Sequence, residues 1–272
     1  MCGRTCTLIP YYIFLQRYDR MPLLSQSLAF AITLVALVQL SRWVTRQVQT
    51  IGWLISGDEN VTMVGYYLLM FPGILLHELS HFITARLLGI RVTDFRLGPR
   101  KRRNSKTIEL GSVSVYSGGT IRDSLVGVAP FVAGTLVLLL VSYTVFDVRA
   151  LGGTWVDRGW NGFFETVATL PQTPDFWLWL YLIFAVSNAM MPSPADRKPW
   201  LLAGLYLGAV VAIAWIAGLF SRLTDGMWEN VLGALQMLTL AFLFTVIVNV
   251  LVGSVLWVIA TALLGASRAR GQ

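Results

Sequence analysis

Residues 61–88 read VTMVGYYLLMFPGILLHELSHFITARLL, and this stretch indicates both the fold class and the chemistry of the chain. A helix needs about 20 mostly apolar residues to cross the hydrocarbon core of a membrane, and the stretch is longer than that. Five further apolar stretches make a total of six predicted spans. These lie at about residues 23–40, 61–88, 125–146, 176–191, 200–220 and 231–264.

The overall composition agrees with a membrane protein. Of the 272 residues, 56% are hydrophobic and only 13% are charged, and the mean hydropathy is +0.65. These values exclude soluble globular, disordered, collagen-like and disulfide-rich secreted proteins. We therefore predict an all-α polytopic membrane protein of about six transmembrane helices, embedded in a lipid bilayer.

The basic residues predict the orientation of the chain. Eight of the 21 Lys and Arg lie between Arg91 and Arg122, beside an apolar span, which indicates a topology signal rather than a nucleic-acid patch. With both termini inside, 16 basic residues lie on the inner side and five on the outer side. We expect a multi-pass protein of the plasma membrane with cytoplasmic termini. An outer interfacial helix is expected at residues 43–55.

The sequence predicts that the chain is divided into three parts. Residues 1–60 hold a leader, the first span and the interfacial segment, and Met21 is a possible alternative start. Residues 61–199 form a three-span core, and residues 200–272 hold two C-terminal spans. Between spans two and three, alternation over residues 112–116, bounded by glycines, predicts a small β element on the cytoplasmic side.

The chain has only two histidines, and both lie in the second span. His77 and His81 are four residues apart, so one helical face presents both imidazoles to a single metal ion. Glu78 lies beside them, where it can take a proton from water at that metal. The alternative is a pair of hydrogen-bonded core histidines, but an acid without a partner inside a membrane costs several kcal/mol.

Zinc favours a third protein ligand and keeps a fourth position for water. Pro192 and Pro194 break the end of the fourth span, and Asp196 follows them at the same predicted membrane depth as the histidines. We predict that His77, His81 and Asp196 bind one Zn²⁺ per chain. The alternative for Asp196 is an interfacial acid paired with Arg197 or Lys198.

These residues resemble the site-2 protease family of intramembrane zinc metalloproteases, six-span type without a PDZ domain. The resemblance lies in the run from His77 to Arg86, in Gly89-Ile90-Arg91-Val92, in Phe95-Arg96-Leu97-Gly98-Pro99, in Gly127-Val128-Ala129-Pro130, and in Asn188 with Asp196. It covers residues 61 to about 200. The chain departs from the family in having Arg197 where a glycine is usual.

The resemblance implies a zinc endopeptidase that cuts a transmembrane segment of another membrane protein. It also implies that Asn188 orients the substrate or stabilises the oxyanion, although helix packing is an equal alternative. The strand at residues 112–116, with Val113 and Val115, is expected to pair with the unwound substrate.

Two other functions remain open. An inactive scaffold of the same fold would have no need of Glu78. A transporter would need more polar residues in other spans, where Asn188 and Asn249 stand out.

Overall fold

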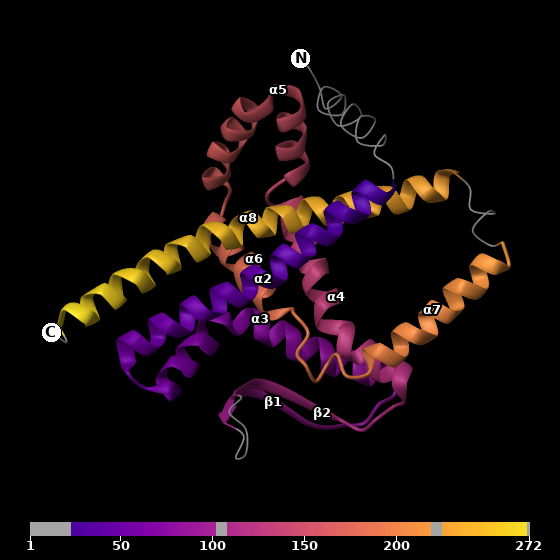
Figure 1. The fold of residues 1–272 in the computed structure, drawn as a ribbon, viewed down its shortest axis with the longest axis horizontal. Coiled ribbons are helices and arrows are strands. Elements are labelled where there is room, and N and C mark those ends of the chain that lie inside the picture. The colour runs from indigo at the N-terminus through magenta and orange to yellow at the C-terminus, as the bar shows by residue number, and fades with distance from the viewer. Residues whose placement is uncertain (1–22, 102–107, 219–224, 271–272) are drawn as a thin grey trace.

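The structure is a computed structural model that describes residues 23–101, 108–218 and 225–270. Its described part is a helical bundle with one small sheet, as predicted (Figure 1). The predicted leader and Met21 lie outside the described residues. The helices are α2 (Leu23–Ser56), α3 (Glu59–Leu87), α4 (Thr120–Thr144), α5 (Val148–Thr169), α6 (Phe176–Ala189), α7 (Trp200–Ile216) and α8 (Asp225–Arg270), with a 3-10 turn at Leu170–Gln172.

Four of the described helices are long and apolar enough to cross a membrane. They contain Leu24–Ser56, Glu59–Leu87, Thr120–Thr144 and Met227–Arg268. The other two predicted spans form apolar helices that are shorter: α6 has 14 residues and α7 has 17. Pro192 and Pro194 lie three and five residues beyond the end of α6 and prevent its continuation. The helix is therefore about 21 Å long, less than the roughly 30 Å of a hydrocarbon core.

Helices α2 and α8 differ from their predicted extents. Helix α2 runs through the expected interfacial segment as one helix of 34 residues. Helix α8 is a continuous helix of 46 residues. The ring of Trp43 packs against Gly253 of this helix, where a methyl group would collide with it. The two helices lie side by side along much of their length (Figure 1).

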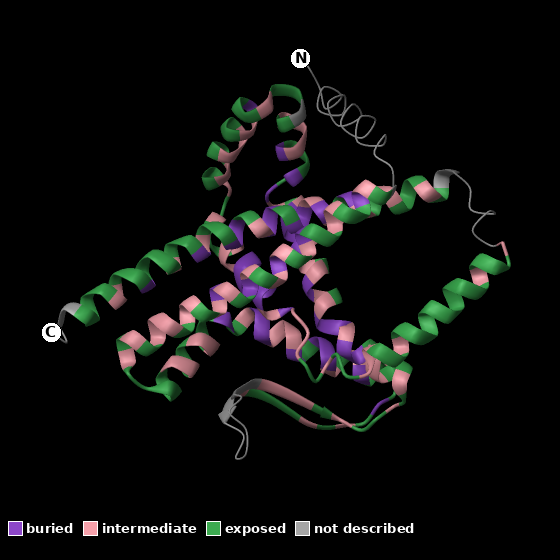
Figure 2. Cartoon of the chain, in the orientation of Figure 1, coloured by how far each residue is buried: buried purple, intermediate pink, exposed green. Residues whose placement is uncertain are grey.

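The core lies where α2, α3, α4, α6 and α8 meet, and buried residues gather there (Figure 2). Helix α7 has no buried residue and packs mainly on α4. A polar network crosses the core: Asn188 Nδ2 donates to Asn249 Oδ1 at 2.6 Å, and Asn249 Nδ2 donates to Ser187 Oγ at 2.9 Å. This network joins α6 to α8 inside an otherwise apolar bundle.

The predicted β element is a two-stranded antiparallel sheet of β1 (Val92–Lys101) and β2 (Ile108–Val115). It lies along α3, on the opposite side of the bundle from α5 (Figure 1). Helix α5 is a hairpin of two arms, because Gly159 adopts φ 61° and breaks the helix. The rings of Trp155 and Trp160 meet across this bend, 4.2 Å apart.

Candidate metal centre

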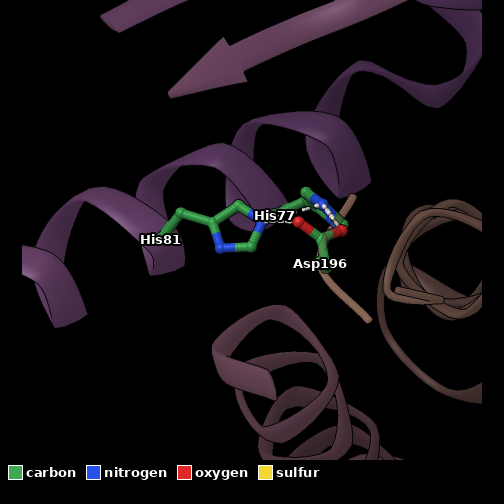
Figure 3. Close-up of side chains that lie close together, drawn as sticks. All are labelled: His77, His81 and Asp196. Carbon is green, nitrogen blue, oxygen red and sulfur yellow. Dashed lines mark hydrogen bonds and ion pairs between the residues drawn. The ribbon is translucent and has the colours of Figure 1, made fainter. Parts of the chain in front are cut away.

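The structure brings His77, His81 and Asp196 together, as the sequence predicts. The Asp58 carboxylate caps the start of helix α3 by accepting hydrogen bonds from the backbone N–H groups of Asn60 and Val61. The helix then runs without interruption through both histidines. His81 Nε2 lies 3.2 Å from His77 Nε2 and 3.3 Å from Asp196 Oδ1. His77 Nε2 lies 3.8 Å from Asp196 Oδ2. Figure 3 shows the two rings on α3 and the carboxylate between α6 and α7 turned toward them.

Backbone carbonyls hold both imidazole rings by their other nitrogen. His77 Nδ1 lies 2.8 Å from the Ala189 carbonyl oxygen, and His81 Nδ1 lies 2.8 Å from the Val126 carbonyl oxygen. A carbonyl oxygen only accepts, so each Nδ1 carries the proton and donates it. In the neutral rings both Nε2 atoms therefore present lone pairs to each other at 3.2 Å. A cation between the two atoms, either one extra proton or a metal ion, would remove this repulsion.

The turn after α6 sets the position of Asp196. The Ser193 backbone N–H donates to Asp196 Oδ2 at 2.7 Å, and the Asp196 N–H lies 3.3 Å from Ser193 Oγ. The hydrogen bond from the Ser193 N–H favours the ionised form of the Asp196 carboxyl. The carboxylate is thus ionised at neutral pH and faces the histidines. Arg197 contacts the turn through its Nε, 3.4 Å from the Ser193 carbonyl.

Two glycines let α6 and the turn after it pack closely on α3 and α4. A methyl group on Gly73 of α3 would collide with the Ala185 carbonyl of α6, and one on Gly127 of α4 would collide with the Asp196 carbonyl. Small residues at such positions allow helix backbones to approach closely in a membrane. The sequence marks Gly127 through the Gly-Val-Ala-Pro element, but its contact with Asp196 is visible only in the fold.

Glu78 is buried beside the two histidines and lies under strand β2. A methyl group on Gly111 would lie 2.7 Å from Glu78 Cγ and 2.8 Å from Oε1. Only a glycine leaves room for the carboxylate there. Sequence reasoning identified Gly111 as a strand boundary and missed this role, since nothing local links it to Glu78.

A pocket of about 750 Å³ leads from β2 to His81 and Asp196. Strand β2 contributes Val113, Ser114 and Val115 to its wall, so both predicted substrate-binding valines lie at the pocket. The Tyr116 N–H donates to the Arg91 carbonyl, and the Ser114 carbonyl accepts from the Thr93 hydroxyl. The backbone groups of residues 114 and 116 therefore face β1. Because backbone groups alternate along a strand, those of Val113 and Val115 face away from β1.

Asn188 lies in α6, next to the carbonyl that holds His77. Its Nδ2 donates both to the Phe184 carbonyl, at 2.8 Å, and to Asn249 Oδ1, at 2.6 Å. Both amide hydrogens are thus used inside the protein, an arrangement that suits helix packing. A contact of Asn188 with substrate stays a prediction.

Compared with known proteins, the chain matches no family model, no curated protein and no solved structure.

Proposed function

We propose that the chain is a zinc-dependent endopeptidase that hydrolyses a peptide bond within or near a transmembrane segment of another membrane protein, as the resemblance to site-2 proteases implies. His77, His81 and Asp196 would hold one zinc ion. Glu78 would be the catalytic acid and base. The observation that carries the proposal is the convergence of two Nε2 atoms and one carboxylate beside a buried glutamate.

The spacing of the three ligands supports a metal rather than a proton. Ligands bound to a tetrahedral zinc at about 2.0–2.1 Å lie about 3.3 Å from one another. The two Nε2 atoms are 3.2 Å apart, His81 Nε2 is 3.3 Å from Asp196 Oδ1, and His77 Nε2 is 3.8 Å from the other carboxylate oxygen, Oδ2. With one ligand atom from each residue, all three atoms lie within 4.8 Å of one another. A single proton would join only one of these pairs, while a zinc ion satisfies all three. The hydrogen bonds from both Nδ1 atoms are also the usual outer contacts of histidines that bind zinc.

The reaction would use the residues as follows. A bound zinc ion supplies a Lewis acid that polarises the scissile carbonyl and lowers the pKa of water. Glu78 takes a proton from the attacking water as it adds to that carbonyl carbon. Glu78 then gives this proton to the departing amine, so that the peptide bond breaks into a carboxylic acid and an amine. The ring contacts to Val126 and Ala189 keep the histidines oriented throughout.

The pocket beside β2 supports a role in binding an unwound substrate. A helix hides its peptide groups, so a transmembrane substrate must unwind before it can be cut. An extended segment added to the outer edge of β2 would use the outward backbone groups of Val113 and Val115. The pocket that these residues line continues to His81 and Asp196, which would bring such a segment to the proposed zinc site.

The proposed protein has six spans, with α6 and α7 as two shorter ones, and both termini cytoplasmic in the plasma membrane. A short α6 supports this arrangement because the turn that follows it then lies within the membrane thickness. Irregular backbone at that depth is tolerated only when protein buries it or a cavity adjoins it. The turn at Asp196 meets that condition, since it lies between α3 and α4 and borders the pocket.

The proposal predicts about one zinc ion per chain of detergent-purified protein. His81→Ala and Asp196→Ala each remove one ligand, so we expect zinc content to fall to a small fraction of the wild-type value. The measurement is elemental analysis of monodisperse protein. Asp123→Ala is the matched control, because Asp123 lines the same pocket but stands apart from the three converging side chains. Wild-type protein without zinc, even after incubation with Zn²⁺, would overturn the metal site.

A second prediction concerns Gly111. Gly111→Ala places a methyl group against the Glu78 side chain, so the carboxylate must move while the ligands stay in place. We expect cleavage of a membrane-embedded reporter to fall roughly 10-fold to 100-fold, since misplacement of a catalytic group by 1 Å has effects of that size. Zinc content should stay at the wild-type level. Gly65→Ala, at a helical glycine of α3 whose surroundings are open, serves as the comparison; equal activity in wild type and Gly111→Ala would contradict the assignment.

A further inference from the structure

Prolines leave both carbonyls that hold the histidines without their usual helical N–H donors. In a helix the carbonyl of residue 126 would accept the N–H of residue 130, but residue 130 is a proline and has no N–H. The Val126 carbonyl is buried among α3 and α4, and it accepts from His81 Nδ1 at 2.8 Å. A buried carbonyl without a donor is unfavourable, so His81 satisfies it.

The second carbonyl follows the same pattern at the end of α6. Ala189 is the last residue of this helix, and in a longer helix its carbonyl would accept the Ser193 N–H. Prolines at positions 192 and 194 prevent that continuation, and the Ser193 N–H donates to Asp196 instead. The Ala189 carbonyl is then available to His77 Nδ1 at 2.8 Å.

We propose that Pro130 is a positioning residue of the metal centre: it leaves the Val126 carbonyl without its helical donor, and this carbonyl holds the His81 ring with Nε2 toward His77 and Asp196. The proposal rests on the proposed zinc site, and it extends that site to a residue in a different helix. It assigns to Pro130 a function in hydrogen bonding rather than in bending α4. Pro130 is fully buried, so packing of its ring is the competing explanation.

Two variants separate these explanations. Pro130→Ala restores an N–H that draws the Val126 carbonyl back into the helix. Replacement of Pro130 by lactic acid, the α-hydroxy analogue of alanine, introduces an ester that has neither the N–H nor the ring. We expect Pro130→Ala to weaken Zn²⁺ binding about 10-fold to 100-fold, as loss of an outer contact to a ligand usually does. The lactic acid variant should bind Zn²⁺ within about 2-fold of wild type, because the carbonyl remains released.

Zinc affinity is measured by competition with a chelator on the full chain in detergent. Pro72→Ala is the matched control, because Pro72 also lies inside a helix, and the carbonyl that it leaves without a helical donor, that of Leu68, is not one of the two that hold the imidazoles. Equal losses in Pro130→Ala and the lactic acid variant would show that the ring matters and would overturn the proposal. Equal losses of zinc affinity in Pro130→Ala and Pro72→Ala would also overturn the proposal. So would a Pro130→Ala variant that binds zinc as tightly as wild type.

A metal-free measurement distinguishes failure of this proposal from failure of the zinc site. The chain has two histidines, so ¹⁵N-histidine labelling gives two ring systems, which His77→Gln assigns. In metal-free protein the Nδ1 proton of His81 should be protected from exchange with water in wild type and in the lactic acid variant, and less protected in Pro130→Ala. Protection unchanged in Pro130→Ala would overturn the role of Pro130, whether or not the protein binds zinc.

Discussion

Glu78→Gln should reduce cleavage of a membrane-embedded reporter by roughly 10²–10⁴-fold while the protein keeps its zinc. The amide has nearly the same shape as the carboxylate, so the contact with Gly111 and the buried packing are retained. An amide cannot take a proton from water, and this is the step assigned to Glu78. The three ligands are untouched. Catalysis and metal binding should therefore separate in this variant.

The reporter is a tagged single-span protein, chosen from a panel by wild-type cleavage in proteoliposomes, and zinc is measured on the same preparations. Glu165→Gln provides the control, because Glu165 lies exposed on α5 and pairs with Arg158 at 3.4 Å. Undiminished cleavage in Glu78→Gln would remove the catalytic assignment. Loss of zinc would instead make Glu78 part of the metal site.

The parts of the site that lie on one helix were predictable from the sequence. His77, Glu78 and His81 follow from a spacing of four residues on an apolar helix. Asp196 was also predictable, because two prolines end the preceding helix and the predicted topology places that end at the same membrane depth as the histidines. These inferences use only local geometry and the thickness of a membrane.

The remaining contacts depend on which helices approach one another, and no local pattern encodes that. The carbonyls of Val126 and Ala189 bond to histidines that are 45 and 112 residues away in the chain. The extents of α2 and α8 were also missed, because each helix continues past its apolar stretch. In α2 the predicted interfacial segment continues the same helix to Ser56. Hydropathy marks the membrane-crossing part of a helix, while backbone hydrogen bonding decides where it ends.

Val115→Pro should abolish cleavage of the reporter while zinc content stays at one per chain. The Val115 N–H faces away from β1, so a proline removes it without breaking a bond of the β1–β2 ladder. A substrate strand added to that edge would lose a backbone hydrogen bond and would meet the proline ring. Val115 lies at the pocket wall, apart from the zinc ligands. The loss should therefore be specific to substrate binding.

Val115→Ala is the decisive comparison, because it removes most of the side chain and keeps the N–H. If the edge binds substrate through its backbone, Val115→Ala should retain most of the cleavage that Val115→Pro loses. Equal losses in both variants would assign the effect to the side chain, and β2 would then be a wall of the pocket rather than a template for the substrate. Full cleavage by Val115→Pro would exclude strand addition at this edge, and substrate would have to reach Glu78 without pairing with the sheet.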